Sequence, residues 1–138
     1  MVASIRVEEN SGPARKAILK GLRGFNRSKI GKQPANDLAI TLRNEADYIV
    51  GGVCGEVWGD WLFVQLLWLD EAHRGERWAT AAMDALEDEA RRIGAQHAYV
   101  DTFSFQAKPF YEKRGYRVFG ELKDFPKGNS RFWLSKDL

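Results

Sequence analysis

The sequence predicts one α/β domain of mixed α and β structure, with a mixed, mostly antiparallel central sheet of about six or seven strands and helices on both faces. Turn signals separate three strands between residues 37 and 69: the first alternates in polarity, and the third is apolar on both faces. A helical pattern then joins the third strand to a fourth, and such a crossover places the two strands parallel. The result is a mixed sheet, antiparallel at first and then with one parallel pair.

The composition is that of an ordinary globular protein. The 138 residues suit a single domain covering 1–138, and 44% apolar residues suffice for a core. The only cysteine, Cys54, excludes an internal disulfide and a multi-cysteine metal site, and it favours a reducing compartment. We find no export signal and no apolar run of membrane-spanning length. We therefore expect a cytoplasmic protein that does not interact with membranes.

The first third of the chain is rich in basic residues. Residues 3–7 alternate like a short strand, and Ser-Gly-Pro at 11–13 begins a helix, since proline is tolerated in a first turn. Two glycines weaken this helix, so residues 25–34 are predicted as a loop or an irregular second helix. Between residues 11 and 36 there is no acidic residue, and the basic ones are Arg15, Lys16, Lys20, Arg23, Arg27, Lys29 and Lys32.

Three strands follow in hairpin order. Residues 37–43 alternate in polarity, residues 44–47 form a turn, and residues 48–58 resume as a strand. The Gly59-Asp60 pair predicts a tight hairpin into residues 61–69, which are apolar on both faces and therefore central in the sheet. Glycines in the middle strand predict a bulge or a close backbone approach, at Gly51, Gly52 and Gly55.

An Arg/Gly turn links the central strand to an amphipathic helix. Apolar residues from Ala79 to Ile93 recur at helical spacing, and Gly94 is suited to a left-handed C-cap. The free N–H groups at the start of this helix, beside Arg74 and Arg77, would attract phosphates. A strand at 96–103, a short helix at 106–114 and a hairpin of residues 116–122 and 131–134 complete the expected order.

Two motifs carry a family resemblance. The segment Arg74-Gly75-Glu76-Arg77-Trp78-Ala79 is similar to [QR]-x-x-G-x-[GA], with Arg77 where glycine is usual. Residues 104–116 are similar to N-x-x-A-x-x-[LF]-Y-x-x-x-G-[FY], with Ser104 in the asparagine position and matches at Ala107, Phe110, Tyr111, Gly115 and Tyr116. With these two motifs and this order of strands and helices, the chain resembles the GNAT superfamily of acetyl-CoA-dependent N-acyltransferases. The resemblance implies a single-domain GNAT-like fold.

The resemblance implies acetyl-CoA as co-substrate. Main-chain groups of Leu67 and Leu69 would pair with the pantetheine arm, and the Leu67 N–H would polarise the thioester carbonyl. Ser104 is also a cofactor-side candidate. The expected phosphate-binding residues are Arg74, Gly75, Glu76, Arg77, Trp78, Ala79 and Thr80. Arg77 either obstructs the pyrophosphate or turns its guanidinium toward it.

Tyr111 is the candidate general acid for the departing CoA thiolate and a further cofactor contact; the alternative is ordinary core packing. The general base is less defined. Glu56 is ranked first because many relatives place such a residue on the acceptor side, ahead of Asp70, Glu71 and Asp101. A chain of water molecules is the other alternative. His73 and His97 are isolated, so no metal site is predicted, and Cys54 has no paired base and is rejected as a nucleophile.

We therefore expect an N-acetyltransferase that moves acetyl from acetyl-CoA to a primary amine of a small molecule, by direct attack in a ternary complex. An acceptor with a carboxylate or phosphate is favoured only if the basic segment faces the cleft. One alternative is a non-catalytic acyl-CoA-sensing domain disabled by Arg77 and Ser104; another is a basic nucleic-acid or protein-binding module. Nucleic acid is a less expected partner than a small molecule, because the net charge of the chain is close to zero. We also expect that the protein can form a homodimer.

Overall fold

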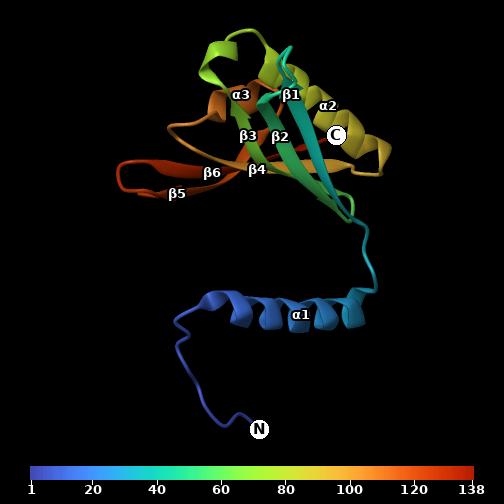
Figure 1. Ribbon diagram of the computed structural model, residues 1–138, viewed down its shortest axis with the longest axis vertical. Coiled ribbons are helices and arrows are strands. Elements are labelled where there is room, and N and C mark those ends of the chain that lie inside the picture. The colour runs from blue at the N-terminus through green and yellow to red at the C-terminus, as the bar shows by residue number, and fades with distance from the viewer. The chain divides into compact units, whose positions relative to one another are not determined.

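The computed structural model describes all 138 residues and divides into two compact units, residues 1–33 and 34–138 (Figure 1). The first unit contains one helix, α1 (Ser11–Ile30). The Asn10 side chain caps this helix by accepting a hydrogen bond from the Gly12 N–H at 3.0 Å. None of the residues of α1 is buried. No helix of the protein has the length and apolar character needed to cross a bilayer.

Two predictions for the first unit are wrong. Residues 3–7 form no strand; Ile5 and Val7 are almost fully exposed, and no neighbouring strand pairs with them. Residues 25–30 continue α1 in place of a loop or a second helix. A glycine inside a helix costs about 1 kcal/mol, which does not interrupt a helix of good formers. Gly31, with φ of 71°, ends the helix.

The second unit is built on a six-stranded sheet. The strands are β1 (Ala35–Arg43), β2 (Ile49–Trp58), β3 (Trp61–Leu69), β4 (His97–Phe103), β5 (Arg117–Lys123) and β6 (Ser130–Asp137). They lie in the order β1-β2-β3-β4-β6-β5, and all pairs are antiparallel except β3 with β4. The antiparallel meander and the parallel crossover are both confirmed. The mixed sheet with its flanking helices also confirms the predicted fold class.

Two helices pack on one face of this sheet. They are α2 (Trp78–Arg92), preceded by a short 3₁₀ helix (Glu71–His73), and α3 (Lys108–Lys113). Leu86 of α2 and Tyr111 of α3 join the same buried core as Leu62 and Val100 of the strands. Side chains alternate along β4, so Val100 faces this core while Asp101 points to the opposite face.

A buried ionic cluster ties both helices to the last strand. Glu87 of α2 is 2% exposed and accepts hydrogen bonds from Tyr116 Oη at 2.9 Å. Its carboxylate also lies 2.7 Å from Lys136 Nζ and 3.2 Å from Arg114 Nη2. The pKa of Tyr116 is raised, first by burial and then by the negative charge of Glu87. This cluster fixes α2 against β6 and against the end of α3.

The glycines of β2 mark a bulge, as predicted. Gly55 pairs with Val64 and Cys54 pairs with Leu66, so Gln65 of β3 has no partner in β2. A Cβ atom on Gly55 would lie 2.9 Å from the Phe63 carbonyl oxygen, so only glycine allows the strands to approach this closely. The extra residue bends β3 at the point where the candidate site begins.

Candidate active site

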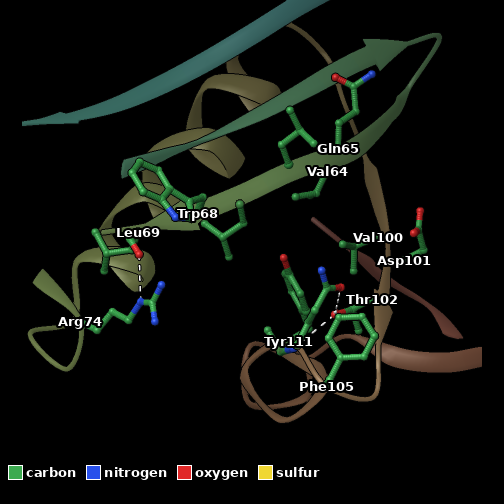
Figure 2. Close-up of a pocket in the computed structure, with 14 residues that line it drawn as sticks. Val64, Gln65, Trp68, Leu69, Arg74, Val100, Asp101, Thr102, Phe105 and Tyr111 are labelled. Carbon is green, nitrogen blue, oxygen red and sulfur yellow. Dashed lines mark hydrogen bonds between the residues drawn. The ribbon is translucent and has the colours of Figure 1, made fainter. Parts of the chain in front are cut away.

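The site is a gap between the two parallel strands. β3 and β4 pair only from Trp61–His97 to Val64–Val100, although both strands continue beyond that point. A cavity of about 590 Å³ occupies the gap (Figure 2). Residues of β3, the end of β4, the following loop, Arg74 and Tyr111 line it. Unpaired strand segments leave main-chain groups free to bind a ligand.

The main chain of β3 turns toward this cavity at two residues. The Asp70 N–H donates to the Val50 carbonyl at 2.8 Å, so the groups of Asp70 face β2. Since direction alternates along a strand, the N–H and C=O of Leu67 and Leu69 face away from β2, and both residues line the cavity. The Leu69 carbonyl accepts a hydrogen bond from Arg74 Nε at 2.9 Å, drawn as a dashed line in Figure 2.

The turn before α2 has an unusual backbone. Arg77, the N-cap residue of α2, has φ of 65° and ψ of 16°, a left-handed conformation, and its side chain makes no capping hydrogen bond. This conformation explains why glycine is usual at the position, because a side chain there costs about 1–2 kcal/mol. The first N–H groups of α2 therefore carry no side-chain cap and remain free for an anion.

The remaining residues of the predicted phosphate-binding segment lie in this turn and in the first turn of α2. Gly75 has φ of 82°, and Glu76 accepts a hydrogen bond from the Trp78 indole N–H at 3.0 Å. Ala79 and Thr80 are half-buried at the start of α2. The Thr80 carbonyl oxygen lies 3.5 Å from Arg114 Nη1, which connects the N-terminal end of α2 to the buried Glu87 cluster.

Tyr111 reaches the cavity from the helical face. Its side chain is 4% exposed and packs edge-on against Phe110 and Tyr116, with ring centroids 5.3 and 5.7 Å apart. Figure 2 shows the phenol rising from α3 toward β3. Burial, and secondarily the charge of Asp101, raises the pKa of Tyr111 to about 12. The hydroxyl therefore remains protonated at neutral pH.

Ser104 lies outside the cavity lining. Its hydroxyl donates to Asn129 Oδ1 at 3.1 Å and accepts from the Ser130 N–H at 3.0 Å. These two bonds join the end of β4 to the β5–β6 turn. Ser104, which takes the asparagine position of the GNAT-like motif, thus binds the final hairpin in this protein.

The four carboxylates considered as general base lie in different places. Glu56 is half-buried in β2 opposite Phe63 and does not line the cavity. Asp70 accepts a bond from the Ala72 N–H at 3.5 Å in the turn, and Glu71 begins the 3₁₀ helix. Only Asp101 lines the cavity.

Sequence reasoning missed several residues of the lining. Gln65 enters it through the bulge, and Phe105 and Gln106 enter from the loop after β4. Gln106 shapes this loop, because its side-chain oxygen accepts a hydrogen bond from the Phe103 N–H at 2.9 Å. The sequence around Gln65 does not itself predict a bulge, although Gly55 in the partner strand β2 indicated a bulge nearby.

The Leu67 main chain, a protonated tyrosine and Arg74 border one cavity, and the uncapped start of α2 follows Arg74 by a few residues. This arrangement has the features expected of an acyl-CoA-dependent transferase, which binds a long acyl thioester with an anionic end.

Comparison with known proteins gives the family. Residues 16–116 match the model of the Acetyltransferase (GNAT) family, and the chain belongs to this family. It is 38% identical over 123 residues to an acetyltransferase of Agrobacterium fabrum, covering 89% of this chain and 90% of the relative. It is 33% identical over 119 residues to blasticidin-S acetyltransferase of Streptomyces morookaense, covering 85% and 88%.

A solved structure extends the likeness to the whole chain. The crystal structure of an acetyltransferase from Agrobacterium tumefaciens superimposes with a TM-score of 0.91 at 34% identity, covering 99% of this chain and all of that one. The protein is therefore an acetyl-CoA-dependent acetyltransferase, and the prediction of acetyl-CoA as co-substrate is confirmed.

Proposed function

We propose that the protein transfers the acetyl group of acetyl-CoA to a primary amine of a small molecule, by direct attack in a ternary complex. The observation that carries this proposal is the gap between β3 and β4, where the Leu67 main chain and Tyr111 border one cavity. The acetyl thioester lies in this gap, with its pantetheine arm along Leu67 and Leu69. Its phosphates lie at the start of α2 beside Arg74 and Arg77.

The reaction needs charge stabilisation on oxygen and then on sulfur. The amine nitrogen attacks the carbonyl carbon, and the Leu67 N–H donates to the carbonyl oxygen as it gains negative charge. The carbon–sulfur bond then breaks. Tyr111 donates a hydrogen bond to the departing thiolate and transfers its proton late, since the raised pKa keeps the phenol protonated until the sulfur is charged.

Glu56 stays the candidate general base from the sequence. Because Glu56 lies outside the cavity lining, it would act through water, whereas its rival Asp101 lines the cavity directly. Glu56→Gln tests this role: if Glu56 is the base, turnover falls about 100-fold or more while acetyl-CoA binding is kept.

A small-molecule acceptor is supported by one of the relatives. The chain is 33% identical to an enzyme named for the acetylation of blasticidin-S, a small molecule. We propose that this protein also acts on a small-molecule amine, in the cytoplasm, where a free thiol such as Cys54 stays reduced. We further propose a homodimer, since α1 exposes Ile18, Leu22 and Phe25 to solvent.

The experiment is a coupled assay. Release of the CoA thiol is followed with acetyl-CoA and a panel of primary amines, for the wild type and for Tyr111→Phe. The proposal expects acetyl-CoA-dependent release that requires an amine and that falls about 100-fold in the variant. Acetyl-CoA binding with no turnover on any amine would instead favour the acyl-CoA-sensing alternative.

A further inference from the structure

We propose that Asp101 is the residue that receives the acceptor ammonium, and that the acceptor is a cationic primary amine carrying a flat apolar group and no carboxylate beside the amine. This inference rests on the proposed acetyl transfer and names the substrate class of the same cavity. Asp101 is the only carboxylate in the cavity lining.

The position of Asp101 matches the direction from which an amine must attack. It follows Val100, the last residue of β4 that pairs with β3, so its side chain stands where the gap opens. Alternation along β4 places Asp101 on the face opposite the core, whereas Tyr111 comes from the helical core face. A thioester in the gap therefore has the proton acceptor for the amine on one side and the proton donor for the sulfur on the other.

Arg131 of β6 holds the carboxylate in this position. Its Nε and Nη2 both bind Asp101 Oδ1, at 3.0 and 2.6 Å, so Oδ2 is left for a ligand. The guanidinium itself lies 4.9 to 5.2 Å from the ring centroids of Phe103, Phe125 and Trp133. Packed between these rings, Arg131 is fixed in place and holds the Asp101 carboxylate in one orientation. It is a positioning residue.

The charge around Asp101 favours a cation. Both Asp101 and Glu56 raise the pKa of Tyr99 by their negative charge, after the larger effect of burial, so both lie near this ring on the sheet face opposite α2 and α3. On this side of the cavity two carboxylates therefore accompany the one guanidinium of Arg131, while Arg74 lines the opposite end beside Leu69 (Figure 2). A cation compensates the excess negative charge, whereas a carboxylate beside the acceptor amine would be repelled.

Two exposed aromatic side chains provide the apolar part of the site. Phe105 lines the cavity and is 60% exposed, with one ring face stacked on Phe103 at 5.3 Å between centroids. Trp68, 56% exposed, lines the cavity from β3 (Figure 2). Exposed aromatic rings at the edge of a cavity bind flat apolar groups by stacking and burial. The acceptor class follows from these rings together with Asp101.

The chemistry balances with these groups. The bound ammonium first gives one proton to Asp101, which passes it to solvent, so that the nitrogen has a free electron pair for the attack. As the nitrogen–carbon bond forms, the nitrogen loses its second proton to Asp101; as the carbon–sulfur bond breaks, Tyr111 gives its proton to sulfur. The products are the acetamide and the CoA thiol. Asp101 then releases its proton to solvent, and Tyr111 takes one back.

A matched pair of amines tests the assignment. 2-Phenylethylamine and phenylalanine differ only in the carboxylate beside the amine, and both are given with acetyl-CoA to the wild type, Asp101→Asn and Glu56→Gln. Asp37→Asn, an exposed carboxylate change on the same sheet face, is the control. We expect the wild type to prefer 2-phenylethylamine. Asp101→Asn should lower kcat/KM for this amine about 100-fold or more and reduce the preference.

Further measurements separate this role from a structural one. Acetyl-CoA affinity, measured by calorimetry, should be unchanged in Asp101→Asn. Asp101→Asn combined with Arg131→Gln removes both charges of the pair, so this double variant should fold and show the same loss. Arg131→Lys, which keeps the charge but loses the paired hydrogen bonds, should raise the acceptor KM more than it lowers kcat.

Three results would overturn the assignment. The first is equal use of phenylalanine by the wild type. The second is unchanged activity in Asp101→Asn with loss in Glu56→Gln. The third is acetylation of other amines but not of 2-phenylethylamine. Absence of acetyl transfer to every amine would instead refute the proposed function, which keeps the two failures distinguishable.

Discussion

Replacing Arg77 by glycine should change stability and acetyl-CoA affinity in opposite directions. The left-handed conformation of Arg77, with φ of 65°, costs about 1–2 kcal/mol for a residue with a side chain. Glycine removes this strain but adds about 0.5–1 kcal/mol of unfolded-state entropy. The free energy of unfolding should therefore rise by about 0.5–1 kcal/mol, and Tm by roughly 2–5 °C.

The same change should weaken acetyl-CoA binding. Arg77 is exposed and forms no ion pair or hydrogen bond through its side chain within the protein, so its guanidinium is available to a phosphate at the start of α2. A hydrogen bond to a charged group contributes about 1.5–3 kcal/mol. Its loss should raise Kd for acetyl-CoA about 10- to 100-fold.

Two further variants separate strain from charge, in thermal unfolding without ligand and in calorimetric titration with acetyl-CoA. Arg77→Lys keeps both the charge and the strain and should resemble the wild type in stability. Arg77→Ala loses the charge and keeps the strain, so it should bind weakly without any gain in Tm. Tighter binding by Arg77→Gly would refute the reasoning and mean that the side chain obstructs the pyrophosphate; a lower Tm would refute the strain argument.

Other properties of the structure lead to three more predictions. Glu87→Leu should lower the free energy of unfolding in urea by about 3–5 kcal/mol, because it leaves Arg114 and Lys136 without their buried partner, while Asp88→Asn on the exposed side of α2 should change it by less than about 0.5 kcal/mol. Similar values for the two variants would contradict this. Tyr111 has a pKa of about 12 in the folded state, above the value of about 10 in the unfolded state, so the unfolded state loses this proton first as pH rises. Relative to an unshifted tyrosine, Tyr111 contributes about 2–3 kcal/mol to the free energy of unfolding below pH 10, and this contribution should be lost between pH 10 and about 12. Tyr111→Phe should show a correspondingly smaller loss in alkaline urea titrations; an unchanged pH profile would argue against the burial effect. If the exposed apolar residues of α1 mediate dimerisation, Phe25→Glu should convert a dimer into a monomer in light scattering, and a monomeric wild type would rule the dimer out.

Local patterns in the sequence were enough to predict most of the sheet. Alternating polarity at residues 37–43, the turn signals after them and the apolar run at 61–69 identified β1 to β3. The helical spacing after Ala79 identified α2 and, through it, the parallel pairing of β4. These features depend on neighbouring residues. Residues 3–7 have the same alternation, but a strand also needs a partner, which a local pattern does not reveal.

The parts that were not predicted depend on contacts between distant residues. The separation of β3 from β4 follows from the register and from the bulge at Gln65, neither of which residue types encode. Asp101 and Arg131 are 30 positions apart and meet only because β6 inserts beside β4. For this reason the sequence could offer Asp101 as one of four carboxylates but gave no ground to prefer it, and it could not place Ser104 against the final hairpin.

The most direct test of the account is the kinetics of Tyr111→Phe at saturating acetyl-CoA and amine, together with the Kd of acetyl-CoA. If Tyr111 serves the departing thiolate in the gap between β3 and β4, kcat falls about 100-fold while Kd changes by less than about 3-fold. An unchanged kcat would contradict the central claim, because the cavity would then not be the place where the carbon–sulfur bond breaks with help from this residue.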